Sequence, residues 1–141
     1  MASWGLQSRT RLAECHRDQQ RVFNEAIRIY NMTVIWGHRG EAAQNAAYQK
    51  RASKKKWPHS NHNSLPSTAI DVAPWPQVYG RNDEERKTIH LEFIYMAGIV
   101  MTVAHYLEVE MRWGGDWDRD LTIADEHFKD LGHFELVNPI P

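Results

Sequence analysis

The longest apolar stretch of the chain is FIYMAGIVMTVA, residues 93–104, and Thr102 is its polar member. A membrane-spanning helix needs about 20 apolar residues, so this stretch predicts a buried helix of a globular domain and no membrane insertion. The helical pattern extends to both sides, over residues 83–109, and is apolar on most sides. We therefore expect one long helix at the centre of the fold.

Before this helix, the chain alternates between helical and extended patterns. Apolar residues recur at helical spacing over residues 8–30, and the Ala-rich segment 40–49 predicts a second helix. Residues 32–36 are β-branched and aromatic, which predicts a short strand. Residues 57–76 are too polar and too rich in proline for a helix, although 69–72 within them predict another strand.

After the long helix, residues 112–125 are rich in Gly and Asp and predict a loop, and residues 133–137 predict a last strand. Helices therefore dominate, with a small sheet. We expect an α+β fold: a single compact domain over residues 1–141, with a small antiparallel sheet and packed helices. A chain of this size leaves no room for a second domain beside this one, and we expect a monomer.

Composition excludes several classes of protein. Hydrophobic residues make up 42% and charged residues 25%, which excludes disorder, collagen and coiled coil. The 17 Lys+Arg balance 18 Asp+Glu, so binding to nucleic acid through bulk charge is excluded. Cys15 is alone, which excludes internal disulfides and zinc fingers with several cysteines. Residues 1–11 are polar, so we expect no signal peptide.

Two segments, residues 60–71 and 130–136, concentrate possible metal ligands. A catalytic zinc ion takes three protein ligands and keeps a fourth position open for water, and His62, Asp71 and His133 would supply such a set. Asp130, three residues before His133, is a candidate base for that water. With 8 histidines in the chain many ligand triples are possible, so spacing alone favours surface or hydrogen-bonded core histidines over a metal site.

The first of these segments resembles a known zinc motif. It runs Ser60-x-His62-Asn63-x-x-Pro66-Ser67-x-Ala69-x-Asp71-Val72-Ala73-Pro74. This pattern resembles the D-alanyl-D-alanine carboxypeptidase and L-alanyl-D-glutamate peptidase (VanY-like) superfamily, and within it the phage endolysin branch. The commoner motif places His and Asp seven residues apart with a glycine between them. Here they are nine apart, which is similar to a longer-loop variant of the same branch.

The resemblance continues on both sides, from about residue 36 to residue 137. Gly37-His38-Arg39-Gly40 followed by Gln44 resembles the upstream arginine motif of the superfamily. Its C-terminal signature is matched by Arg112-Trp113-Gly114-Gly115-Asp116-Trp117-Asp118 and by Phe128-x-Asp130-x-x-His133-Phe134-Glu135-Leu136. Gly132 stands where a proline usually precedes the histidine.

The resemblance implies roles for individual residues. His62, Asp71 and His133 correspond to the ligands of one zinc ion per chain, held in a cleft. Asp130 corresponds to the residue that activates the zinc-bound water, and Arg39 to the arginine that steadies the substrate oxygen as it becomes negative. Two further residues have open roles: Ser60 either supports the ligand loop or is a turn serine, and Glu135 either supports the site or is a charge at its rim.

The resemblance also implies a function: a zinc-dependent endolysin that cleaves the L-Ala–D-Glu bond in the stem peptide of bacterial peptidoglycan by metal-activated water. Such an enzyme accumulates in the host cytoplasm and leaves through a holin pore to reach the wall. A D,D-carboxypeptidase acting on D-Ala-D-Ala ends is an alternative with the same site. A non-catalytic cell-wall-binding module is an alternative of another class, which the loss of a ligand or of the base would favour.

Three features leave alternatives open. Asp116, Asp118 and Asp120 alternate like the first ligands of a calcium loop, although Leu121 stands where the turn glycine is expected. The alternative is a polar surface loop whose aspartates bind their own backbone. Trp113 and Trp117 fit either the cleft wall or the core. The lysines at 54–56 fit either a solvated loop or contact with anionic wall material.

Overall fold

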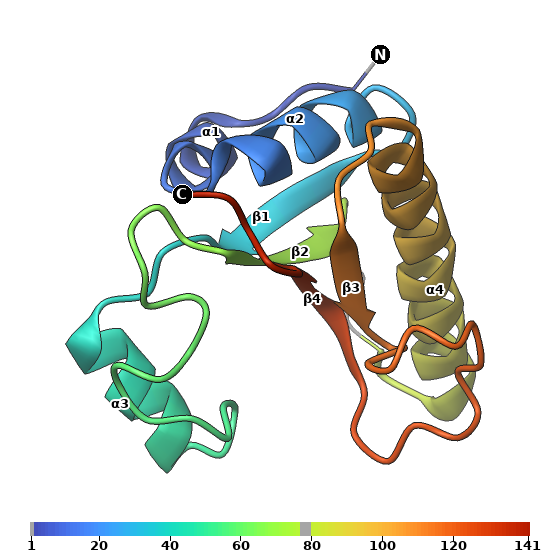
Figure 1. The fold of residues 1–141 in the computed structure, drawn as a ribbon. Coiled ribbons are helices and arrows are strands. Elements are labelled where there is room, and N and C mark those ends of the chain that lie inside the picture. The colour runs from blue at the N-terminus through green and yellow to red at the C-terminus, as the bar shows by residue number, and fades with distance from the viewer. Residues whose placement is uncertain (1, 77–79) are drawn as a thin grey trace.

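The sheet brings together strands from distant parts of the chain. The computed structural model describes residues 2–76 and 80–141. Its elements are, in chain order, α1 (Leu6–Ala13), α2 (Arg17–Ala26), β1 (Met32–Trp36), α3 (Glu41–Gln49), β2 (Ala69–Pro74), α4 (Asp83–Tyr106), β3 (Met111–Gly114) and β4 (Asp130–Leu136). The strands form one antiparallel sheet in the order β1-β2-β4-β3 (Figure 1).

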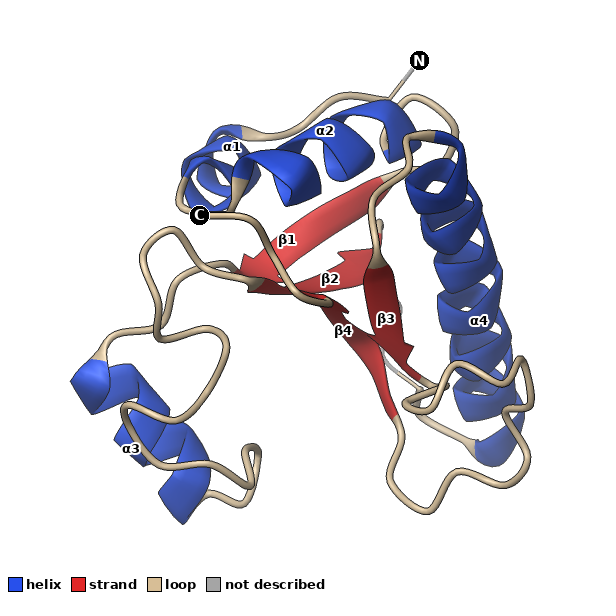
Figure 2. Ribbon diagram, viewed as in Figure 1, coloured by secondary structure: helices blue, strands red, loops and turns tan. Residues whose placement is uncertain are grey.

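Helices cover one face of this sheet (Figure 2). α4 packs against β2, β3 and β4, α2 packs against α4, and α1 packs against β1. In the core between these layers, the ring of Phe23 on α2 meets that of Phe134 on β4 edge to face, with their centroids 5.6 Å apart. The predicted α+β architecture with a small antiparallel sheet is therefore confirmed.

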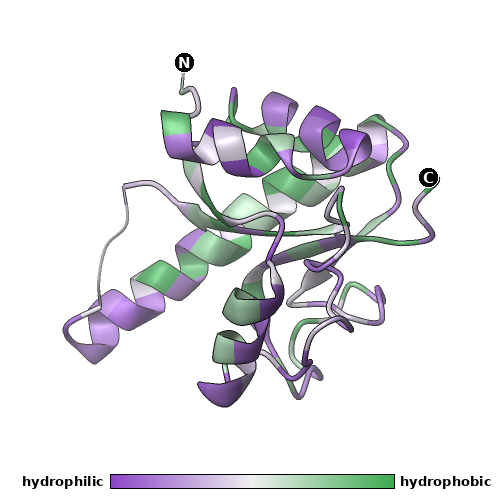
Figure 3. Cartoon of the chain, turned by 90° about the vertical axis from the view of Figure 1, so that its left-hand side faces the viewer, coloured by the Kyte–Doolittle hydropathy of each residue, from purple (hydrophilic) through white to green (hydrophobic). Residues whose placement is uncertain are grey.

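α4 is less buried than the sequence predicts. Met96, Val100 and Val103 face the core, whereas Tyr95 and Tyr106 are 66% and 80% exposed. Its first turns are hydrophilic and the apolar residues lie further along (Figure 3). By length and composition alone, it is the one helix in the described ranges that could cross a membrane, and core helices of globular domains pass the same test. The expectation of a helix apolar on most sides and buried at the centre is wrong; α4 covers the sheet with one face.

The single helix predicted over residues 8–30 is in fact two helices. The chain leaves the helical path between α1 and α2 because the backbone there pairs with a distant loop: Ser67 N donates to Glu14 O and His16 N donates to Ser67 O, both at 2.8 Å. Nδ1 of His16 then accepts the N–H of Asp18 and caps α2. A tertiary contact thus overrides the local helical pattern.

The C-terminal half holds one strand more than predicted. Residues 112–125 were expected to be loop throughout, but Met111–Gly114 form β3, and Met111 lies opposite Leu136 in β4. β4 begins at Asp130, three residues before the predicted start. A strand of four residues is too short to show a clear alternation in the sequence, so its pairing partner decides its structure.

α3 and the loop that follows it stand apart from the sheet (Figure 1). Residues 50–66 return from α3 towards β2 without helix or strand. The uncovered face of the sheet therefore looks towards this segment. The expectation of a single domain over residues 1–141, with no separate cell-wall-binding domain, remains a prediction.

Candidate metal centre

The register of the sheet brings Asp71 and His133 together. They are direct partners in the antiparallel β2–β4 pair, and the neighbouring pair, Ile70 and Phe134, is buried in the core. Because successive side chains of a strand alternate between faces, Asp71 and His133 project from the face that the helices leave uncovered. His133 Nδ1 lies 2.9 Å from Asp71 Oδ1.

His62 reaches the same carboxylate from the loop before β2. Its Nδ1 donates to Gly37 O at 2.8 Å, which leaves Nε2 directed at Asp71 Oδ1, 3.3 Å away. A Cβ on Gly37 would lie 2.3 Å from the carbonyl oxygen of Arg11, so this close backbone approach requires glycine. The Nε2 atom is buried and has no hydrogen-bond partner among the described residues.

These three side chains fit a metal ion. One donor atom from each of His62, Asp71 and His133 lies within 4.8 Å of the others. Two imidazoles and one carboxylate are a ligand set typical of catalytic zinc. The partnerless Nε2 of His62 supports this fit, because a buried ring nitrogen without a partner is costly unless something binds it. The residues present therefore form a candidate metal-binding group.

Hydrogen bonds within the group shift its proton affinities. Burial by itself would raise the pKa of Asp71, but the hydrogen bond with His133 and the adjacent His62 imidazole outweigh it and hold that pKa well below the usual range. Burial by itself would lower the pKa of His133, whereas its hydrogen bonds with Asp71 and Glu135 raise it to about 9. Asp71 is therefore an anion, ready to bind a cation.

Glu135 is a buried hydrogen-bond partner of His133. It is 5% exposed and accepts hydrogen bonds from His133 Nε2 at 3.2 Å and Asn61 Nδ2 at 2.6 Å. Arg112, its partner in β3, donates from Nε at 2.6 Å. Burial alone would raise the pKa of Glu135, but these three donors lower it to about 2. A carboxylate on the outer ring nitrogen fixes the orientation of a ligating histidine.

Asp130 joins the site through an irregular strand pairing. In a regular strand, residues three apart point to opposite faces, so Asp130 and His133 would not meet. Here Trp113 lies opposite Phe134, whereas the next residue, Gly114, lies opposite Asp130. Such an irregularity re-aims side chains, and both Asp130 and His133 line one pocket.

The carboxylate of Asp130 has a raised proton affinity. Burial raises its pKa, the nearby Asp71 carboxylate adds to the increase, and His133 partly offsets it. A carboxylate with a raised pKa accepts a proton more readily than an ordinary aspartate.

Arg39 lies on the far side of Asp71. Its Nη2 donates to Asp71 Oδ2 at 3.2 Å and its Nη1 to Gln44 Oε1, also at 3.2 Å. The guanidinium is buried and still lines the pocket. Arg39 thus binds Oδ2 of Asp71, whereas Oδ1 of the same carboxylate faces His62 and His133.

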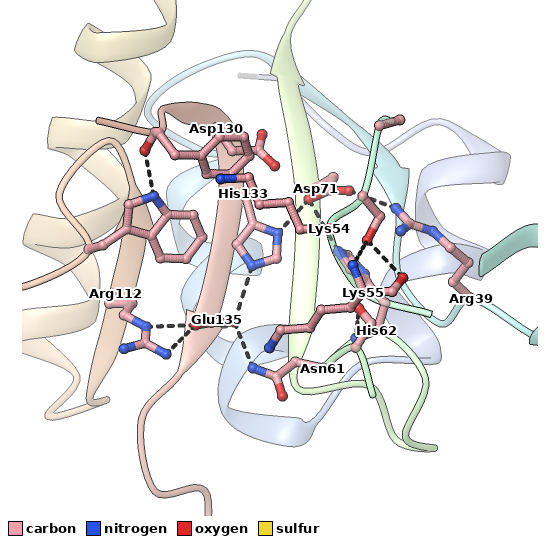
Figure 4. A pocket seen from close by; sticks show the side chains of 15 residues that line it. Arg39, Lys54, Lys55, Asn61, His62, Asp71, Arg112, Asp130, His133 and Glu135 are labelled. Carbon is pink, nitrogen blue, oxygen red and sulfur yellow. Dashed lines mark hydrogen bonds and ion pairs between the residues drawn. The ribbon is translucent and has the colours of Figure 1, made fainter. Parts of the chain in front are cut away.

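The pocket itself has a volume of about 340 Å³ and opens between β4 and the loop after α3 (Figure 4). Trp117 and Phe128 form part of its wall, and their stacked rings are 6.2 Å apart. Trp113 is buried in the core instead. Of the two tryptophans with open roles, one therefore lines the cleft and the other packs in the core.

Comparisons with known proteins agree with this geometry. The model of the family described as phage L-alanyl-D-glutamate peptidase matches residues 2–137. The chain belongs to this family. It is also similar to a solved structure, the L-Ala D-Glu endopeptidase ChiX of Serratia marcescens, with 25% identity and a TM-score of 0.66. That match covers 94% of this chain and 87% of the other. Comparison with curated proteins gave no significant match.

The predicted enzyme class is therefore confirmed: the chain is a peptidoglycan peptidase of the L-Ala–D-Glu type. The candidate site residues of this peptidase come from four separate parts of the chain: the segment between β1 and α3, the loop before β2, β2 itself and β4. Five further histidines do not line the pocket: His38, His59, His90, His105 and His127.

Ser60 forms hydrogen bonds within the loop that carries His62, and it does not contact a donor atom of the candidate metal ligands. Its Oγ accepts the N–H of His62 at 3.3 Å, and its backbone N–H is bound by Asn63 Oδ1 at 2.9 Å. The loop closes through the N–H of Thr68, which donates to Asn61 O at 3.1 Å. The two extra residues between His62 and Asp71 thus belong to a loop that Ser67 anchors to the α1–α2 junction.

Gly132 allows β4 to approach β2 closely. A Cβ on this residue would lie 2.6 Å from the carbonyl oxygen of Val72. This close contact explains why the residue before His133 carries no side chain here.

The aspartates of the 115–129 loop bind their own backbone. Asp116 accepts the N–H of Asp120 and of Leu121, each at 3.1 Å, and Asp120 accepts the N–H of Thr122 at 2.7 Å. The carboxylates of Asp116, Asp118 and Asp120 also lie within 4.8 Å of one another. The contacts are those of turn aspartates, which favours the polar surface loop over the calcium-loop alternative.

Sequence reasoning missed two residues that hold the site in place. Gln44 entered only as part of a motif, yet it is fully buried and bonds to Arg39 and, through Nε2, to Ser53 Oγ at 3.0 Å. Asn61 had no predicted role beside His62, yet its Nδ2 donates a hydrogen bond to the carboxylate of Glu135. Their place beside motif residues was the one available signal.

Proposed function

We propose that the peptidase is zinc-dependent and holds one zinc ion per chain through His62 Nε2, Asp71 and His133 Nδ1. The observation that carries this proposal is the buried, partnerless Nε2 of His62, which faces the carboxylate that His133 also faces. When bound, zinc polarises the scissile carbonyl and lowers the pKa of the attacking water. The histidines and Asp71 position that ion beside the pocket.

Asp130 is the proposed general base. It lines the same pocket as the ligands, and its raised pKa suits a group that takes a proton from water and passes it to the leaving amine. It has no hydrogen bond to another side chain within the described part of the chain, so its oxygens remain available for the water.

Arg39 is proposed to act on the substrate oxygen and on Asp71 together. Its buried guanidinium provides a fixed positive charge and forked donors at the pocket. A charge placed where negative charge develops in the transition state lowers the barrier. Because Nη2 already bonds to Asp71, Arg39 also orients that carboxylate.

The substrate bond follows from the family and is tested directly by digestion. We expect the purified, zinc-loaded peptidase to cut stem peptides between L-Ala and D-Glu, which mass spectrometry of digested muropeptides detects. Loss of only the terminal D-Ala would instead indicate the D,D-carboxypeptidase alternative. The presence of all three candidate ligands and of Asp130 in one pocket favours an enzyme over a non-catalytic wall-binding module.

We also propose that the peptidase acts as a monomer, because every residue of the site comes from one chain. Its accumulation in the host cytoplasm before release remains part of this proposal. Size-exclusion chromatography tests the first statement, and fractionation of infected cells tests the second.

A further inference from the structure

Two lysines at the pocket have no charged partner in the part of the chain that the structure describes. Four lysine and arginine side chains line it, and two of them are paired with carboxylates of the site: Arg39 with Asp71 and Arg112 with Glu135. Within residues 2–76 and 80–141, no carboxylate lies within 4.0 Å of the ammonium group of Lys54 or Lys55. Both side chains extend across the pocket (Figure 4).

The backbone that carries these lysines is held from inside the protein. The buried Gln44 donates from Nε2 to Lys55 O and to Ser53 Oγ. Ser53 Oγ also accepts the N–H of Lys55 at 3.2 Å. The loop is therefore anchored to the residue that also bonds Arg39, although its lysines are exposed.

Lys54 also has a fixed place across the pocket. Its Nζ lies 4.0 Å from the centroid of the Phe128 ring, within the range of a cation–π contact. Phe128 precedes β4, so this contact joins the loop after α3 to the opposite wall. A cation is thereby positioned over the pocket without being neutralised.

The expected substrate has an anion that these cations match. A glutamyl residue within a peptide uses one carboxyl group in the chain and keeps the other as a free carboxylate. In an L-Ala–D-Glu substrate this carboxylate belongs to the residue that donates the scissile nitrogen, so it enters the pocket with the bond to be cut. Cations that are not already paired bind such a group best.

We propose that Lys54 and Lys55 bind the free carboxylate of the D-glutamyl residue and so select the bond that is cleaved. This inference rests on the proposed function and deepens it. Arg112 is excluded from the role because Glu135 occupies its donors, and Arg39 because it is already assigned to the scissile carbonyl oxygen and to Asp71.

The test compares two synthetic stem peptides that differ at one group. One keeps the free carboxylate of D-Glu, and in the other this group is a carboxamide. We expect the parent enzyme to cleave the carboxylate peptide with a kcat/KM roughly tenfold higher, the size expected for two partly exposed ion pairs. The double variant K54Q/K55Q should lose this preference and cleave the carboxamide peptide as the parent does.

Lys56 provides the matched control. It lies in the same loop, but its Nζ is 5.0 Å from the Tyr48 ring of α3 and it does not line the pocket. Lys56→Gln removes the same charge and should leave both rates unchanged. Calorimetric titration of the Asp130→Asn variant with both peptides gives a second readout, because binding is then measured without turnover. The carboxylate peptide should bind more tightly, again by roughly tenfold.

The outcomes separate the two proposals. A parent enzyme that cleaves both peptides equally, or a double variant that keeps the preference, overturns the carboxylate site and leaves the proposed function standing. An equal loss in Lys56→Gln also overturns it, since the effect would then be one of bulk charge. A parent that cleaves neither peptide overturns the proposed function, and the carboxylate site with it.

Discussion

Asp71 and His133 are 62 residues apart in sequence yet are direct partners in the β2–β4 pair, with His133 Nδ1 2.9 Å from Asp71 Oδ1. The candidate metal centre is therefore built on paired strands, whose backbone hydrogen bonds hold both side chains in place. His62 completes it from a loop that is closed by its own hydrogen bonds. Groups placed on rigid elements suit a metal that needs fixed ligand geometry.

Removal of any one ligand should release the metal. We expect about one zinc per chain in the parent protein and loss of most of it in His62→Ala, Asp71→Ala and His133→Ala, because two ligands hold zinc poorly. Elemental analysis of the purified proteins measures this. His90→Ala, an exposed histidine of α4, is the control and should keep the parent's zinc. Three ligand variants with parental zinc content would disprove the assignment.

Glu135→Gln should weaken zinc binding without removing a ligand. The change keeps the size of the side chain but removes the charge that orients His133, so zinc affinity should fall by about 10- to 100-fold. Competition with a chelating dye measures the affinity. Glu110→Gln removes a carboxylate that pairs with Arg119 on the surface, and it should change nothing. Equal affinities in the two variants would argue against a supporting role for Glu135.

Asp130→Asn should separate binding from chemistry. Asparagine keeps the shape of the side chain and cannot accept the proton of the water, so zinc content should persist while activity falls by about 10²- to 10⁴-fold. Turnover of purified peptidoglycan is the measurement. Asp125→Asn changes an exposed aspartate of the preceding loop and should remain active. Near-parental turnover in Asp130→Asn would remove Asp130 from the role of base.

Arg39→Lys should fold and bind zinc but lose turnover. An ammonium group cannot reproduce the fork that bonds Asp71 and Gln44 at the same time. We expect kcat to fall with little change in KM, as for a contact made mainly in the transition state. Zinc content measured on the same sample distinguishes this from a loss of Asp71 orientation. Unchanged turnover would contradict the oxyanion role.

Calcium addition distinguishes the two interpretations of the 115–129 loop, a calcium loop or a polar surface loop. Its aspartates already accept backbone N–H groups, so we expect calorimetry to show no calcium uptake at millimolar levels. The chelator-treated, zinc-reconstituted enzyme should then have the same activity with and without calcium. An increase in activity that Asp118→Ala abolishes would instead establish a calcium loop.

The sequence predicted most elements and all the proposed ligands, but not how they meet. The helical pattern over residues 8–30 continued through the point where Ser67 binds the backbone of Glu14 and His16, so no local signal marked the break. β3 was not predicted within its Gly- and Asp-rich segment, because its strand structure depends on pairing with β4. Local patterns predict elements only where no distant partner competes.

The sequence by itself determined the α+β class, the family and the residue types of the site, since these depend on periodicity and on motif spacing. Only the tertiary structure decided that Asp71 faces His133 and that Glu135 is buried against Arg112. It also decided that two lysines, without a carboxylate partner among the described residues, lie over the pocket. The physical reason is that strand register and loop docking are set by packing of the whole core. A shift of one residue in that register would turn Asp71 towards the helices and abolish the site.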